Sequence, residues 1–179
     1  GCAATKKTYV SMKNYTQGEY YLQNENYGDC IATFKAEVGM YPADANAHFY
    51  LGRSYLATER NQSALTHLKK AVNLEQGNAD YHFWKGVAHA ANGQSKSELK
   101  SYQDTLVIKP DHVQALVYLG HNRFDSGDYH TALGYYNRAL EKDSDIPQAL
   151  YNRGLVLRRL KRTPEEITTW KMYLDAYSD

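Results

Sequence analysis

The sequence has 179 residues, of which 42% are apolar and 23% charged, a composition typical of a folded globular chain. Its 21 Lys and Arg residues nearly balance its 20 Asp and Glu residues, so the net charge of +1 provides no field that would attract nucleic acid or an anionic membrane. No apolar run of about 18 residues occurs, so no segment of this sequence is expected to cross a bilayer.

The first ten residues, 1–10, are mostly small or polar and are expected to form a flexible tether ahead of a folded region. Within them, Gly1 and Cys2 precede Ala3 and Ala4. This order resembles the junction of a bacterial lipoprotein, where a signal peptide is removed directly before a cysteine that is then acylated. The resemblance implies a lipid on Cys2 as the only link to a membrane. The alternative is a soluble protein in which Cys2 has no such role.

A glycine recurs every 34 residues along the rest of the chain, as Gly18, Gly52, Gly86, Gly120 and Gly154. A fixed period of this length is typical of a repeat protein. The frame that makes each glycine the eighth residue divides the chain into five units without an insertion. These units are residues 11–44, 45–78, 79–112, 113–146 and 147–179.

Most units show two amphipathic segments separated by a short polar break. The breaks fall at residues 58–61, 92–95, 126–128 and 161–163. This pattern predicts two helices joined by a turn in each unit. Small residues at the eighth and twentieth places would let the two helices approach closely, and large residues at the twenty-fourth place would fill the space beside them.

The residue types at fixed places of each unit resemble the tetratricopeptide repeat family. The second unit carries this pattern clearly, with His48, Leu51, Gly52, Tyr55, Ala64, Leu68 and Ala71. The resemblance implies an all-α fold, a right-handed superhelical solenoid of five helix-turn-helix units over residues 11–179. The first unit departs from the pattern, because Asn14 and Gln17 hold places that are apolar in the family. Such polarity is typical of a terminal unit whose outer side meets water.

In the resembling family, the first helices line a concave groove that binds partners. The fifth, sixth and ninth places of each unit contribute much of that groove, and in this sequence they are rich in aromatic residues. The predicted groove residues are Tyr15, Phe49, Tyr50, Arg53, Phe83, Trp84, Val117, Tyr118, His121 and Tyr151. Aromatic rings with polar tips are common interface anchors. The alternative for any one ring is packing between neighbouring first helices.

The predicted partner is a protein or peptide segment, extended or helical, with apolar or aromatic side chains. Members of the family that bind the acidic C-termini of chaperones use a clamp of Lys and Asn on three consecutive first helices. The matching places here are Tyr15, Glu19, Asn46, Tyr50 and Trp84. No such carboxylate clamp is therefore expected, and nucleic acid is not an expected partner.

The last unit ends within its second helix, where Ile167 and Leu174 hold positions that would face a following helix. An apolar end of this kind is expected to be exposed. It would either associate with a second copy or be covered by residues outside this sequence.

Signatures of catalysis are missing from the sequence, which has no Gly-rich phosphate loop, no Gly-x-Ser-x-Gly elbow and no His-Glu-x-x-His motif. We therefore expect no enzymatic activity, no cofactor and no metal. His48, His82 and His89 hold places of large packing residues, so they are interpreted as core residues rather than metal ligands. Cys30 holds a place that is usually small and buried and is interpreted as an inert core thiol.

These features predict a non-enzymatic scaffold that binds another protein. With a lipid on Cys2, it would be similar in plan to the tetratricopeptide lipoproteins that serve as pilotins for type IV pilus secretins at the outer membrane. It would then lie on the periplasmic face of a membrane in the bacterial cell envelope. The rival function is a cytoplasmic adaptor or regulator that recruits a client peptide. A third is a sensor that binds a small molecule or metal in the aromatic groove.

Overall fold

The structure is a computed structural model that describes residues 15–177. These residues are helical apart from short turns, and no strand occurs among them. They form two compact halves, an N-terminal half that ends at Ser101 and a C-terminal half that begins at Tyr102. The helical content confirms the predicted all-α fold class.

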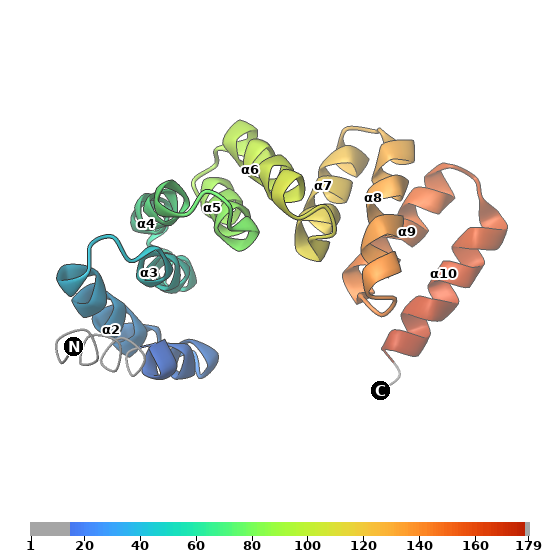
Figure 1. Cartoon of the computed structure of the whole chain (residues 1–179). Coiled ribbons are helices and arrows are strands. Elements are labelled where there is room, and N and C mark those ends of the chain that lie inside the picture. The colour runs from blue at the N-terminus through green and yellow to red at the C-terminus, as the bar shows by residue number, and fades with distance from the viewer. Residues whose placement is uncertain (1–14, 178–179) are drawn as a thin grey trace. The chain divides into compact units, whose positions relative to one another are not determined.

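The helices follow one another in pairs along the chain (Figure 1). Residues 15–23 are helical, and α2 (Tyr27–Met40), α3 (Ala45–Ala57), α4 (Asn61–Leu74) and α5 (Ala79–Ala91) follow them in the N-terminal half. Helix α6 (Ser95–Ile108) contains the boundary between the halves. The C-terminal half continues with α7 (Val113–Asp125), α8 (Tyr129–Lys142), α9 (Pro147–Arg159) and α10 (Thr163–Ala176).

Helix starts recur with the 34-residue period of the sequence. The first helices of the repeats, α3, α5, α7 and α9, begin at residues 45, 79, 113 and 147. The second helices, α2, α4, α6, α8 and α10, begin at residues 27, 61, 95, 129 and 163. The predicted helix-turn-helix units are therefore observed, and the turns within them occupy residues 58–60, 92–94, 126–128 and 160–162.

The turn within each repeat has one residue in the left-handed backbone region. The five residues are Glu25, Glu59, Gly93, Gly127 and Lys161, with φ between 57° and 81°. In each case the next residue donates its backbone N–H to a carbonyl five residues back in the first helix, with N···O distances of 2.8 or 2.9 Å. A residue with a Cβ pays roughly 1–2 kcal/mol in this region, so closure of the turn outweighs local preference in three repeats.

In the N-terminal half, the two helices of a repeat touch where a glycine faces a large side chain. A Cβ on Gly52 would lie 2.6 Å from Cγ of Leu68, and a Cβ on Gly18 would meet the ring of Phe34. Leu68 and Phe34 are fully buried and hold the twenty-fourth places of their repeats. The predicted close approach at the eighth place is therefore confirmed in this half.

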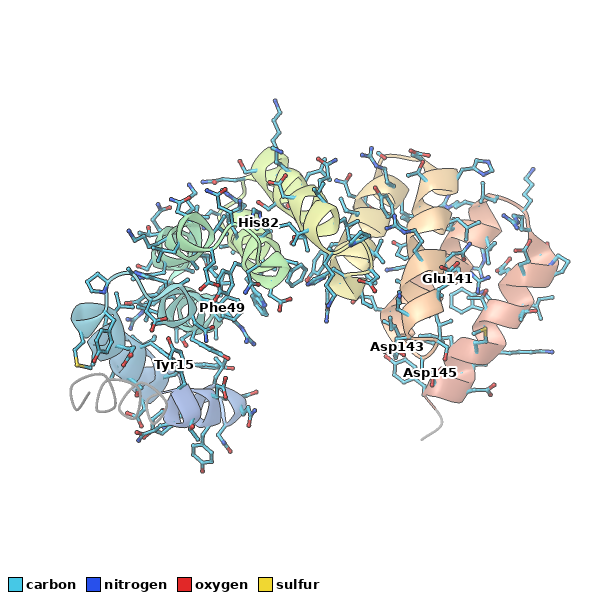
Figure 2. The ribbon with its side chains drawn as sticks, viewed as in Figure 1. Tyr15, Phe49, His82, Glu141, Asp143 and Asp145 are labelled. Atoms are coloured by element: carbon cyan, nitrogen blue, oxygen red, sulfur yellow. The ribbon has the colours of Figure 1, made fainter. Side chains whose placement is uncertain are left out.

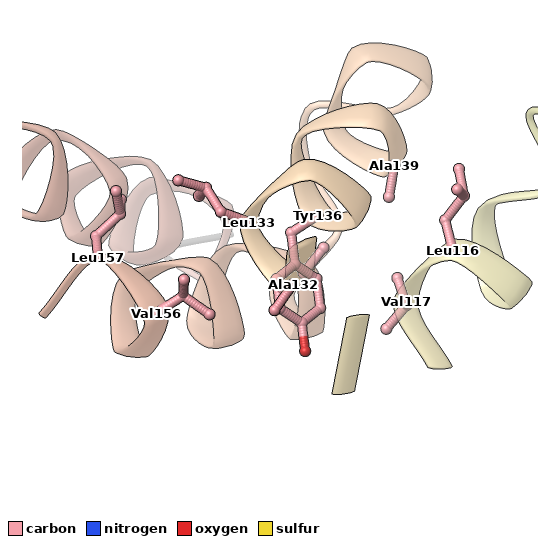
Figure 3. Close-up of a cluster of buried hydrophobic side chains, with 9 residues drawn as sticks. Leu116, Val117, Ala132, Leu133, Tyr136, Ala139, Val156 and Leu157 are labelled. Carbon is pink, nitrogen blue, oxygen red and sulfur yellow. The ribbon is translucent and has the colours of Figure 1, made fainter. Parts of the chain in front are cut away.

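The C-terminal half uses the same contact with larger partners. A Cβ on Gly120 would lie 2.7 Å from the ring of Tyr136, and one on Gly154 would lie 2.6 Å from the ring of Trp170. Figure 3 shows Tyr136 in the middle of a cluster of apolar side chains from α7, α8 and α9. This cluster joins three consecutive helices into one core.

Replacing Gly120 by Ala should destabilise the protein by about 1–3 kcal/mol, because the added methyl group overlaps the buried Tyr136 ring. The matched control is Gly134→Ala in α8, where no atom lies within 4 Å of the new Cβ. That exposed change should stabilise the helix by about 1 kcal/mol. Urea unfolding followed by circular dichroism measures both. Equal stabilisation by the two substitutions would contradict the packing argument.

Candidate functional site

The predicted groove residues of the N-terminal half divide into exposed and buried sets. Tyr15, Tyr50 and Trp84 are partly exposed. Phe49 and Phe83 are buried, with 8% and 7% of their surface accessible. Figure 2 shows Tyr15 and Phe49 among the side chains of this half.

The prediction that the fifth-place residues face a partner needs correction for Phe49, Phe83 and Val117. The Phe49 ring lies 4.9 Å from the ring of Tyr81 on α5, so it packs between two first helices. Val117 has 5% of its surface accessible and belongs to the core cluster of the C-terminal half (Figure 3). The alternative of packing between first helices therefore holds for Phe49, while Phe83 and Val117 are buried.

The hydroxyl groups of Tyr15 and Tyr50 are each hydrogen-bonded to a carboxylate. The Tyr15 hydroxyl donates to Oδ1 of Asp44 at 2.6 Å, and the Tyr50 hydroxyl donates to Oε1 of Glu19. Burial and the bond to Glu19 raise the pKa of Tyr50 to about 12, so it remains a neutral donor. The Tyr50 ring stacks on Phe34 at 5.0 Å with an interplanar angle of 10°. The rings are thus fixed before any partner arrives.

Asp44 has a second role that sequence reasoning missed. It is the N-cap of α3, where Oδ1 accepts the backbone N–H of Ala47 at 3.0 Å. The same oxygen accepts the Tyr15 hydroxyl. The signal was present in the sequence, because Pro42 and Asp44 precede a helical segment in the manner of a helix start. The link to Tyr15 depends on the tertiary structure.

Arg53 lies on the same face with its guanidinium against aromatic rings. Its Cζ is 4.5 Å from the centre of the Trp84 ring and 5.5 Å from that of Phe49. Both distances are in the range of cation–π attraction. Burial lowers the pKa of Arg53. The face of the N-terminal half therefore presents two ordered rings, Tyr50 and Trp84, beside one cation.

The C-terminal half presents two tyrosines at its predicted groove positions. Tyr118 and Tyr151 have 43% and 45% of their surface accessible. The Tyr118 ring lies 5.1 Å from that of Tyr102, and Tyr151 packs edge-on against Trp170 at 5.5 Å. His121 is exposed, and its Nε2 lies 3.5 Å from a carboxylate oxygen of Asp125 one turn later. These three side chains are exposed, and their place in a binding groove stays a prediction.

A hollow of about 320 Å³ lies beside Tyr118. It is lined by the starts of α7 and α9 and by the turn before α9. Asp143 and Asp145 of that turn border it (Figure 2). The Asp145 backbone N–H donates to Oδ1 of Asp143 at 3.1 Å. The hollow joins an exposed ring to an acidic rim, and sequence reasoning missed it because the turn carries no motif.

The three histidines that were interpreted as core residues are buried. His48, His82 and His89 have 6%, 9% and 6% of their surface accessible. Nε2 of His82 lies 3.0 Å from the carbonyl oxygen of Gln76, and Nδ1 of His89 lies 2.7 Å from Oε1 of Gln94. No cluster of three or more His, Cys, Asp or Glu side chains with metal-binding geometry occurs within residues 15–177.

His48 forms a stacked pair with His67, a contact that sequence reasoning did not identify. Nε2 of His48 must donate to the Pro42 carbonyl oxygen at 3.1 Å, so its Nδ1 accepts from Nδ1 of His67 at 2.9 Å. Both contacts are satisfied when the two rings are neutral, whereas protonation of both rings would place two N–H groups against each other. Burial and the neighbouring His48 lower the pKa of His67 to about 4. Burial also lowers the pKa of His48.

Acid should therefore destabilise the folded chain through this pair. Below the ordinary histidine pKa of about 6.5, the unfolded chain binds protons that His67 in the folded chain does not, so stability falls as the pH drops from about 7 to 4. His67→Gln should remove on the order of 2 kcal/mol of that fall, after allowance for its partial exposure.

The control is His130→Gln, because His130 is exposed on α8. It should keep the full pH dependence. Urea unfolding of the three proteins at a series of pH values provides the comparison. If the unfolding free energies of wild type and His67→Gln fall in parallel as the pH drops, the His48–His67 pair is not the origin of the acid destabilisation.

Cys30 is fully buried, as its interpretation as a core thiol requires. Its thiol donates to the carbonyl oxygen of Gly18 at 3.4 Å, and its sulfur lies 2.9 Å from the Ser54 hydroxyl. Burial raises the pKa of the thiol. A buried, protonated thiol is a poor nucleophile.

The end of the C-terminal half exposes apolar side chains of α10, as predicted. Ile167 and Leu174 have 52% and 64% of their surface accessible. Self-association through them stays a prediction. None of the helices within residues 15–177 has the length and apolar character needed to cross a membrane. Cys2 lies outside the described residues.

Comparison with known proteins identifies the repeat. A family model described as "Tetratricopeptide repeat" matches residues 15–78, 52–113 and 117–179. A search of curated proteins finds no match.

Several solved structures share the fold. A structure described as MamA is 18% identical with a TM-score of 0.75 and covers 89% of this chain and 94% of its own. The structure described as YrrB, "a TPR protein with an unusual peptide-binding site", is 17% identical with a TM-score of 0.70. The match covers 99% of this chain and 92% of the YrrB chain. The Pseudomonas aeruginosa protein pilF is 14% identical with a TM-score of 0.87. The match covers 96% of this chain and 78% of the pilF chain. At such identities the likeness establishes the fold alone.

Proposed function

Because the chain belongs to the tetratricopeptide repeat family, we propose that it is a non-enzymatic scaffold that binds a segment of another protein. The binding surface is the face of the N-terminal half that carries Tyr50, Arg53 and Trp84. The tyrosines Tyr118 and Tyr151 provide a second contact surface in the C-terminal half.

The observation that supports this function is that the partly exposed rings of Tyr50 and Trp84 are held in fixed positions. Tyr50 is held by its hydroxyl bond to Glu19 and by stacking on Phe34, and Trp84 is covered on one side by Arg53. Ordered aromatic side chains lose little conformational entropy on binding and make good anchors. YrrB, which shares the fold, is described as having a peptide-binding site.

Trp84→Ala should weaken binding of the cellular partner by about 2 kcal/mol while the helices remain folded, because the ring is partly exposed. The matched control is Tyr20→Ala, since Tyr20 is an aromatic residue with 61% of its surface accessible on another part of the N-terminal half. The measurement is affinity capture from the native host, followed by titration of the captured protein.

Phe83→Ala is not a test of the binding face. Phe83 is buried, so its truncation should cost about 3–5 kcal/mol of folding free energy. If Trp84→Ala captures the same proteins with unchanged affinity, the proposed binding face is wrong.

The finer proposal is that this scaffold is an assembly factor of the bacterial envelope, of the pilotin kind that serves type IV pilus secretins. It would be anchored on the periplasmic side of the outer membrane by a lipid on Cys2. Its support is the order of Gly1, Cys2 and the small and polar residues after them, which resembles a lipoprotein junction. The alternative is a cytoplasmic adaptor that recruits a client peptide through the same face.

Fractionation of the native host separates the two proposals. For the envelope protein, the membrane fraction should contain the chain, and the N-terminal peptide should carry the added mass of acyl groups on Cys2. Cys2→Ser should release the protein from the membrane, because the lipid is its only proposed anchor. An unmodified Cys2 in a cytosolic protein would exclude the envelope role and favour the adaptor.

A further inference from the structure

The guanidinium of Arg53 contacts aromatic rings, as that of Arg60 does, but Arg53 is the less exposed of the two. No hydrogen bond or ion pair joins it to any residue within 15–177, and its Nε is buried without an acceptor. A buried N–H without an acceptor is unfavourable. The side chain therefore keeps one N–H donor without a protein acceptor on the proposed binding face.

The carboxylates nearest to this face are engaged elsewhere. Glu19 accepts the hydroxyl of Tyr50, and Asp44 accepts the hydroxyl of Tyr15. The negative charge of Asp80 raises the pKa of Arg53, opposing the effect of burial. Glu19 and Asp44 are thus engaged by tyrosine hydroxyls rather than by this guanidinium.

Other cations of the chain show what a satisfied site looks like. Arg158 pairs with Glu166 at 2.7 Å, and Arg162 pairs with Glu165 at 2.6 Å. His121, which holds the same place as Arg53 two repeats later, lies against Asp125. Arg53 lacks such a partner, and among the described residues it shares a buried Nε without an acceptor with Arg153, which belongs to the C-terminal half.

The rings orient the guanidinium for recognition. Trp84 lies 4.5 Å from Cζ and Phe49 lies 5.5 Å from it, so the planar group is held against apolar surface. Arginine keeps its charge at all ordinary pH values and presents a fork of donors that matches a carboxylate. A carboxylate arriving here would meet a cation that is already oriented and partly dehydrated, which strengthens the pairing.

We propose that Arg53 is the recognition residue for an acidic side chain, a glutamate within the partner segment, whose carboxylate pairs with the guanidinium while neighbouring apolar side chains contact Tyr50 and Trp84. This inference rests on the proposed function. A single guanidinium matches one carboxylate charge. A glutamate also has a methylene stem that suits the adjoining rings.

Peptides selected from a random 12-residue library test the proposal. The library is displayed with its C-terminal ends joined to the carrier, so that no free terminal carboxylate is offered, and it is selected on the wild-type chain. Selected peptides should contain a glutamate at a constant position next to apolar residues. The best peptide is then synthesised with acetylated and amidated ends, and its dissociation constant is measured by calorimetry.

Changing the glutamate of that peptide to glutamine should weaken binding to the wild-type chain at least about tenfold. The same change should have almost no effect with Arg53→Gln, because the partner charge is gone. The matched control is Arg60→Gln, since Arg60 also lies over a ring, Tyr55, but on an exposed position outside the face. Arg60→Gln should still bind the glutamate peptide more tightly than the glutamine peptide, by the same factor as wild type.

Two outcomes would overturn the inference. Selected peptides could lack a constant acidic residue, or the glutamine peptide could lose the same affinity with wild type and Arg53→Gln. If such peptides still fail to bind Trp84→Ala, the proposed function stands and only the role of Arg53 fails. If neither peptides nor cellular proteins bind the face, both fail.

Discussion

The contact between an eighth-place glycine and a large twenty-fourth-place side chain sets the distance between the two helices of a repeat. At Gly120, a single added carbon would lie 2.7 Å from Tyr136, closer than van der Waals contact permits. The same close approach occurs at Gly52 with Leu68, although leucine is smaller than tyrosine. The glycine backbone, which carries no side chain, thus sets the spacing between the two helices. This spacing positions the first helix of each repeat.

The position of the first helices decides which side chains are left for a partner. Fifth-place residues such as Phe49 pack into the space between one first helix and the next. Sixth-place residues such as Tyr50 and Trp84 remain partly exposed. Their hydroxyl and cation–π contacts then restrict their motion. Exposed and buried aromatic side chains therefore occupy adjacent positions on the same helical turns.

The electrostatics of the surface follow from how its charges are paired. Most charged contacts in the described residues involve exposed side chains, such as Arg162 with Glu165, and these stabilise a fold only slightly. Arg53 is partly dehydrated and unpaired, which costs stability in the free chain. This cost and the position of Arg53 on the proposed binding face support its proposed role in recognition.

The repeat architecture was determined by the sequence alone. The period of the glycines, the polar breaks and the large twenty-fourth-place residues are local signals, and each is present in several copies in one register. The burial of His48 and Cys30 followed from the same frame, because equivalent places in a repeat meet equivalent neighbours. Some turns have a residue other than glycine in the left-handed conformation, such as Glu59, and the repeat frame is unchanged there.

Only the tertiary structure decided which groove residues face outward. Neighbouring places on a helix differ by about 100° in direction, so a small rotation of α3 against α5 determines whether Phe49 or Tyr50 is covered. That rotation depends on the packing of both helices, which no single repeat encodes. The pairings of Tyr15 with Asp44 and of His48 with His67 join distant residues within one repeat, and the contact of Arg53 with Trp84 joins two repeats. The chain could be assigned its architecture from period and residue type, but its binding chemistry required the positions of side chains far apart in sequence.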